Sequence, residues 1–155
     1  MSDAESNAPL PDKIPEQVIG EVVWRDLTVA DAPGLRDFYR EVVGWSVSEL
    51  EMPAPAEGEE PYSDFVMQAG KAGSDEVDAV AGVVHARGTN AGLPPVWLMY
   101  VRVAEITASI AAAEARGGKC VHGPRSMGGG VFAVVRDPAG AQLGLWEDSG
   151  AFAAS

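Results

Sequence analysis

The stretch V-F-A-V-V-R-D-P-A-G-A-Q-L-G-L-W-E, residues 131–147, is the part of the chain that decides the fold. An apolar run lies on each side of a central turn sequence. Asp137 can accept hydrogen bonds from the backbone just after it, Pro138 presets φ for a turn, and Gly140 tolerates a positive φ. The stretch therefore predicts two antiparallel strands joined by a tight turn.

The rest of the chain carries the same kinds of element in a repeated order. Apolar runs and alternation predict strands, and apolar residues spaced three and four apart predict one helix in each half. The first helix follows Asp31, a favourable N-cap, has Pro33 in its first turn and ends at Gly44. The predicted strands are 21–29, 45–50, 62–68, 78–86, 96–103, 119–122, 132–135 and 143–146, and the helices are 32–43 and 105–116.

Matching landmarks in the two halves lie 74 positions apart: Val29 and Val103, Asp31 and Glu105, Gly44 and Gly118. This internal repeat predicts an α+β fold made of two tandem βαβββ units. Because each helix covers only one face of its sheet, the curved mixed sheets of the two units should enclose a cavity.

The predicted domain boundaries follow from this repeat. We expect a single domain at 18–148, built from unit one at 20–87, a linker at 88–95 and unit two at 96–148. The acidic, proline-containing segment 1–17 has little to bury and is expected to be a disordered tail, and 149–155 a C-terminal tail.

Composition restricts the partners. With 11 basic and 23 acidic residues the net charge is −12, which argues against nucleic acids and anionic membranes and either favours cations or merely keeps the protein soluble. The single cysteine, Cys120, rules out an internal disulfide and is expected to be a small buried hydrophobe. The sequence carries neither a secretory signal nor an apolar run near the ~20 residues of a membrane span, so we expect a cytoplasmic protein.

Two motifs in this frame carry a family resemblance. D-A-P-G-L-R-D-F-Y-R-E-V-V-G-W at 31–45 and R-D-P-A-G-A-Q-L-G-L-W at 136–146 resemble the vicinal oxygen chelate superfamily, which includes glyoxalases, bleomycin- and fosfomycin-resistance proteins and extradiol dioxygenases. The resemblance covers roughly residues 20–148. The segments 82–100 and 123–128 are similar to an uncharacterised bacterial subgroup of glyoxalase-like proteins.

The resemblance implies four pseudo-symmetric positions for metal ligands. They fall here on Trp24, Gly82, Leu98 and Gly144, and none of these side chains can bind a divalent ion. We therefore expect no metal cofactor. The alternative is a rearranged zinc, iron or nickel site that uses His85, Asp26 or Glu147.

Strand alternation predicts which side chains line the cavity. It directs Trp24, Asp26 and Thr28 inward from the first strand, Leu98, Tyr100 and Arg102 from the fifth, and Gln142, Gly144 and Trp146 from the last. Aromatic rings around a carboxylate suit a flat or cationic organic ligand, and the two glycines should leave it room. The alternative is a plain core in which Asp26 pairs with Arg102. The ligand-binding candidates are Trp24, Asp26, Met67, His85, Arg87, Tyr100, Arg102 and Trp146.

Other polar residues support two interpretations each. His85 points away from the metal positions by strand alternation, so it is either a hydrogen-bonded structural group or a catalytic base. Arg87 could bind a ligand carboxylate or form an exposed ion pair. Arg125 and the glycines 128–130 are expected to form a mobile loop, which serves either as a lid or only as a turn.

These observations favour a metal-independent protein that binds a small aromatic or cationic molecule. The rivals are a metalloenzyme of the glyoxalase or dioxygenase kind, a metal-free isomerase with His85 as its base, and a protein that acts through an interface. A homodimer is compatible with the resemblance, but the sequence identifies no surface for it.

Overall fold

The computed structural model describes residues 17–52, 58 and 60–149. They form an α+β fold whose elements follow the order predicted from the sequence, with one short 3₁₀ helix, η2 (Gly88–Asn90), in the predicted linker. The elements are β1 (Val22–Val29), α1 (Ala32–Val43), β2 (Ser46–Met52), β3 (Tyr62–Gly70), β4 (Val77–His85), β5 (Trp97–Arg102), α2 (Ile106–Ala115), β6 (Lys119–Met127), β7 (Gly130–Arg136) and β8 (Gln142–Asp148).

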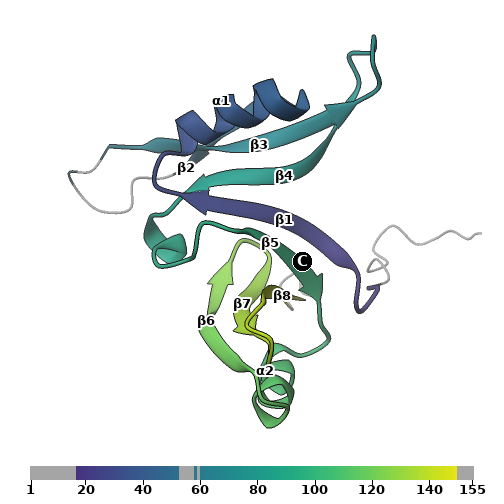
Figure 1. Cartoon of the computed structure of the whole chain (residues 1–155), viewed down its shortest axis with the longest axis vertical. Coiled ribbons are helices and arrows are strands. Elements are labelled where there is room, and N and C mark those ends of the chain that lie inside the picture. The colour runs from purple at the N-terminus through teal and green to yellow at the C-terminus, as the bar shows by residue number, and fades with distance from the viewer. Residues whose placement is uncertain (1–16, 53–57, 59, 150–155) are drawn as a thin grey trace, which may run out of the picture.

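All eight strands belong to one sheet, in the order β2-β3-β4-β1-β5-β8-β7-β6. In each half the first strand pairs in parallel with the last, β1 with β4 and β5 with β8. The halves meet where β1 and β5 pair in antiparallel, so the sheets of the two units are continuous across this β1–β5 seam. Figure 1 shows the sheet curving between α1 and α2, which lie at opposite ends of the molecule.

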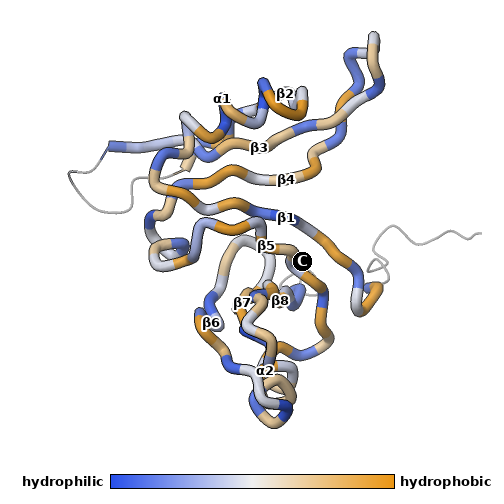
Figure 2. Tube along the Cα trace, viewed as in Figure 1, coloured by the Kyte–Doolittle hydropathy of each residue, from blue (hydrophilic) through white to orange (hydrophobic). Residues whose placement is uncertain are grey.

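Helix α1 is bounded by the predicted capping residues. The Asp31 carboxylate accepts a hydrogen bond from the Gly34 N–H at 3.0 Å, and Gly44 ends the helix with a φ of 79°, a left-handed conformation that glycine adopts without strain. The helix covers a buried cluster of Leu27, Val29, Ala32, Phe65, Met67, Ala81 and Val83. Figure 2 shows hydrophobic stretches along the strands beneath it.

Helix α2 is shorter by one residue at each end than predicted, and its N-cap is Glu105. A second, unpredicted contact adds to this cap. The carboxylate of Glu147, from β8, accepts a hydrogen bond from the backbone N–H of Ile106 at 2.8 Å. The helix covers a second cluster of Ile106, Ala133, Val135 and Leu145, against which the partly buried Cys120 packs. The expectation for Cys120 is thus met in part.

The hairpin at 131–147 is confirmed. Asp137 accepts hydrogen bonds from the backbone N–H groups of Ala139 and Ala141 at 2.8 and 3.0 Å. The preceding loop was predicted wrongly: Arg125 lies inside β6 and pairs with Phe132, and Met127 pairs with Gly130. Because the strands extend to a two-residue turn at Gly128 and Gly129, this segment is the tip of a hairpin and not a separate lid.

The predicted tails fall almost wholly outside the described residues, since 1–16 and 150–155 are not among them; neither are 53–57 and 59. Within the described ranges, no helix is long and apolar enough to cross a membrane.

Candidate functional site

The predicted cavity residues of β1, β5 and β8 do share a face. Trp24 is the register partner of Tyr100, and Arg102 is the partner of Trp146. We call this the inner face, because α1 and α2 pack on the opposite, outer face. Strand alternation was therefore a sound guide along most of β1. A register shift at Val23 is the exception and turns that side chain toward the cluster around Tyr100.

At the centre of the inner face Trp24 and Asp26 form a pair. The indole N–H of Trp24 donates to Asp26 Oδ1 at 2.7 Å. The carboxylate lies over Gly82 on the neighbouring strand, where a Cβ atom would come within 2.2 Å of Asp26 Oδ1. A glycine at position 82 is thus required for Asp26 to lie flat on the sheet.

The Asp26 carboxyl has an unusual acidity for an aspartate. Burial raises its pKa to about 6, the hydrogen bond from Trp24 opposes the rise, and the charge of Asp64 adds to it. A carboxyl group with this pKa titrates close to physiological pH. A cationic partner would stabilise its ionised form, because it compensates for the lost solvation.

Gly144 has the same structural role as Gly82 on the other side of the seam. A Cβ there would lie 2.4 Å from the ring of Tyr100, which packs over the glycine. Burial and the charge of Asp26 raise the pKa of the Tyr100 hydroxyl. The expectation that the two glycines leave open volume was wrong, because neighbouring side chains occupy both places.

A second tryptophan–carboxylate pair lies further along this face. The Trp146 N–H donates to Asp148 at 2.8 Å, repeating the W-x-D spacing of residues 24–26. Arg102 neutralises this carboxylate through its Nε at 2.8 Å and also reaches Glu21 at 2.7 Å. The alternative in which Arg102 pairs with Asp26 was therefore wrong.

His85 has a partner that sequence reasoning missed. Asp64, which is only 4% exposed, lies 3.1 Å from His85 Nδ1 and accepts the His85 backbone N–H at 2.8 Å. The Tyr62 ring contacts His85 edge-on at 5.0 Å, and the guanidinium of Arg87 lies 4.1 Å from the centre of that ring. The sequence signal that could have indicated this partner is a single carboxylate, Asp64, inside the apolar stretch Y-S-D-F-V-M.

Met67 does not belong with the ligand-binding candidates. Its side chain is fully buried in the cluster beneath α1, on the outer side of the sheet. The remaining candidates fall into three groups, which are Trp24–Asp26–Tyr100, Arg102–Trp146 and His85–Arg87.

The residues do not suit the metal ion that the family resemblance implies. The four equivalent positions carry an indole, an alkyl chain and two glycines. Within the described residues, no three histidine, cysteine or carboxylate side chains gather into a possible metal site. The rearranged site finds no support either, since Glu147 caps α2, His85 pairs with Asp64, and Asp26 takes the Trp24 N–H.

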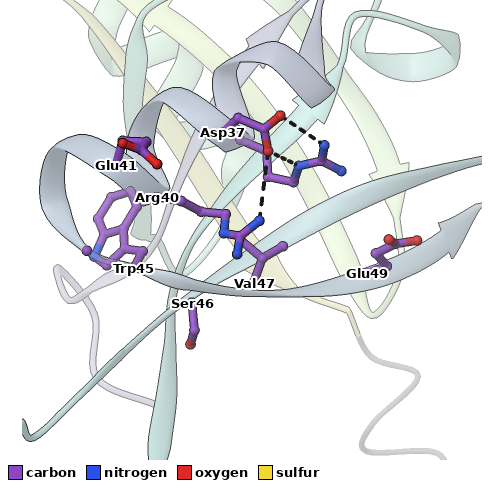
Figure 3. Close-up of a pocket in the computed structure, with 9 residues that line it drawn as sticks. Asp37, Arg40, Glu41, Trp45, Ser46, Val47 and Glu49 are labelled. Atoms are coloured by element: carbon purple, nitrogen blue, oxygen red, sulfur yellow. Dashed lines mark hydrogen bonds and ion pairs between the residues drawn. The ribbon is translucent and has the colours of Figure 1, made fainter.

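A groove of about 800 Å³ lies elsewhere, between α1 and the edge strand β2. Figure 3 shows Arg40 and Asp37 pointing toward one another from α1. Asp37 also contacts Arg36 at 2.9 Å, so both arginines of this groove have a carboxylate partner. None of the predicted ligand-binding residues lines it.

Three kinds of comparison relate the chain to known proteins. CFP32 of Mycobacterium tuberculosis, whose name proposes that it is a glyoxylase, is 27% identical over 126 residues, which are 80% of this chain and 44% of that protein. The anthracycline biosynthesis protein DnrV of Streptomyces peucetius is 27% identical over 129 residues, which are 82% of this chain and 46% of that protein. The chain thus spans less than half the length of these relatives.

Solved structures share the fold. A variant of Streptomyces coelicolor methylmalonyl-CoA epimerase in complex with 2-nitronate-propionyl-CoA aligns with a TM-score of 0.52 at 12% identity, covering 85% of this chain and 96% of that one. The model of the Glyoxalase/Bleomycin resistance protein/Dioxygenase superfamily matches residues 19–145. Together with the predicted motifs and the observed fold, this match establishes that the chain belongs to that superfamily.

Proposed function

We propose that the protein binds a flat organic cation on its inner face, without a metal, and that Trp24 and Asp26 are the main contacts. The observation that carries this proposal is the Trp24–Asp26 pair over Gly82. It offers an indole and a carboxylate whose solvation is already reduced, and a cationic ring can use both, by cation–π contact and by charge. Tyr100, the register partner of Trp24, adds a second aromatic ring.

The charges around the pair support a cationic ligand over an anionic one. Asp26 lies near the charge of Asp64, and the net charge of the chain is −12. Arg102 is held by Asp148 and Glu21. An incoming anion would meet two carboxylates, whereas a cation would relieve their repulsion.

The test uses fixed planar cations, each paired with its neutral ring parent: ethidium with phenanthridine, and N-methylacridinium with acridine. Calorimetric titration at neutral pH should give tighter binding of at least one cation than of its parent, and Asp26→Asn should weaken that binding about tenfold or more because a desolvated charge pair is lost. Elemental analysis after incubation with iron, zinc, manganese and nickel checks the metal-free part, with near-zero metal per chain expected.

Asp148→Asn is the matched control. It changes the same group in the same W-x-D spacing, but at a carboxylate that Arg102 already neutralises. Binding should survive in this variant. Equal binding of every cation and its parent, or full affinity in Asp26→Asn, would refute the cation site, and stoichiometric metal would refute metal independence.

A second candidate is proton transfer by His85, and the Asp64 contact favours it. A carboxylate 3.1 Å from Nδ1 holds the ring with that nitrogen protonated and leaves Nε2 as the base. The fold neighbours with bound acyl-CoA compounds suggest methylmalonyl-CoA as a probe. Deuterium uptake from D₂O into this compound, followed by mass spectrometry, should occur with the wild type and vanish in His85→Ala. Absence of uptake in the wild type would reject this candidate for that substrate.

A further inference from the structure

The linker between the two units sends one side chain onto the inner face of the sheet. Leu93 is only 7% exposed. It packs on four buried residues of β5 and β7, which we call the inner cluster: Leu98, Tyr100, Phe132 and Val134. The strand register places this cluster on the inner face, since Tyr100 pairs with Trp24 and Val134 pairs with Gly144. Leu93 therefore covers the inner cluster from outside the sheet.

A hydrogen bond holds the linker in this position. His122 Nε2 donates to the Thr89 carbonyl at 3.0 Å, and the His122 ring centre lies 5.6 Å from that of Phe132. The linker joins β4 to β5, whereas His122 belongs to β6, and both β8 and β7 lie between β5 and β6 in the sheet. A linker that reaches β6 must cross the inner face, so this contact fastens it across the inner cluster.

The linker is built so that it can move as a unit. Its first turn is closed internally by a hydrogen bond from the Ala91 N–H to the Gly88 carbonyl at 3.1 Å. Gly88 and Gly92 have φ values of 59° and 91°, which glycine reaches without strain, and a Cβ at either position would meet no atom within 4 Å. The turn can therefore leave the sheet intact once the Leu93 and His122 contacts break.

The inner cluster adjoins the proposed cation site. Trp24 packs against the cluster that contains Leu93, and Leu98 is the register partner of Asp26. Trp24 and Asp26 are themselves only partly buried, so a ligand can reach them while the linker is closed. A ligand that extends from this pair along the inner face meets Leu93.

We infer that the inner cluster is a second subsite, in which Leu93 is a displaceable occupant, and that the ligand carries an aliphatic arm which takes its place. This inference rests on the proposed cation site, where the flat cationic ring of the same ligand binds. The arm covers the apolar surface that Leu93 leaves, so the linker opens without exposing the inner cluster to water. The ligand class is thereby narrowed to a flat cation with a flexible aliphatic chain.

Two acridinium compounds with the same charged ring test this inference. Calorimetric titration should show that N-hexylacridinium binds the wild type more tightly than N-methylacridinium does, because only the hexyl chain reaches the inner cluster. Leu93→Ala should strengthen binding of the hexyl compound about tenfold, since its arm no longer has to displace a buried leucine. Binding of the methyl compound should stay within about twofold.

Leu145→Ala is the matched control. Leu145 is 6% exposed, but it packs beneath α2 on the outer face. Its truncation removes the same side chain at similar burial and should leave both affinities within about twofold.

Hydrogen exchange of residues 88–95 follows the linker itself. N-hexylacridinium should accelerate exchange there, and N-methylacridinium should not. His122→Ala should accelerate it without any ligand, because the bond to Thr89 is lost.

Three results would overturn the inference: an unchanged affinity of Leu93→Ala for the hexyl compound, an equal gain for the methyl compound, or an equal gain in Leu145→Ala. If neither cation binds, the proposed cation site fails, and N-phenyl-1-naphthylamine, an uncharged probe that fluoresces in apolar surroundings, decides on the subsite separately. Brighter fluorescence with Leu93→Ala than with the wild type and Leu145→Ala would retain the subsite, and equal fluorescence would exclude it.

Discussion

At the scale of single residues, the Asp26 carboxyl makes the stability of the protein depend on pH. Its pKa of about 6 lies above the unfolded value of about 3.9, so the native state holds its proton more tightly. Stability should therefore fall as pH rises from about 4 to about 6 and then level off. Asp26→Asn should match the wild type near pH 4 and exceed it by on the order of 2 kcal/mol at pH 7, since the amide can still accept from Trp24. Urea unfolding of both proteins across this range measures the difference, and parallel curves would contradict it.

The same residue marks how far the sequence could predict the site. Alternation along an isolated strand identified Trp24, Asp26, Tyr100 and Trp146 as one face, because that depends only on the two-residue period of a strand. The fit of Asp26 over Gly82 depends on strand pairing across more than fifty residues of sequence, which no local pattern encodes. Met67 was misassigned for a related reason. The side of the sheet on which it lies depends on the pairing of β3 with β4 and on the face that α1 covers, and the sequence of β3 alone reveals neither.

At the scale of elements, the stability of the α2 N-terminus depends in part on a side chain from strand β8. Glu147 satisfies the otherwise unpaired backbone N–H of Ile106, one of the buried residues of its cluster. Glu147→Ala should lower the free energy of unfolding by about 1–2 kcal/mol and leave ligand binding unchanged. Chemical denaturation measures it, with Glu114→Ala on the exposed side of α2 as the control, which should change stability by no more than about 0.5 kcal/mol. If Glu147→Ala lost ligand binding without losing stability, Glu147 would be part of the binding site and not only a helix cap.

Element boundaries were predictable where the chain carries its own signals. Asp31, Gly44 and Asp137 each make the backbone contact expected of them. Strand β6 was truncated in the prediction because its last five residues, G-P-R-S-M, lack an apolar period and are extended by pairing with β7. The cap from Glu147 could likewise not be predicted from the sequence, since it joins residues 41 positions apart.

At the scale of the whole molecule, the repeat of 74 residues predicted two similar units but not how they join. The sequence offered no indication that β1 and β5 would pair, since neither strand has a turn that leads into the other. Once paired, they produce a single curved sheet whose inner face carries the proposed ligand site.

The continuous sheet has a consequence for synthesis on the ribosome. When only the first unit has emerged, β1 has β4 on one side and nothing on the other, so its backbone groups form an open edge. An open edge invites pairing with any neighbouring nascent chain. The edge closes only when residues 97–102 have left the exit tunnel, and the interval between the two events is the period in which a growing chain is most exposed to misassembly on a crowded polysome.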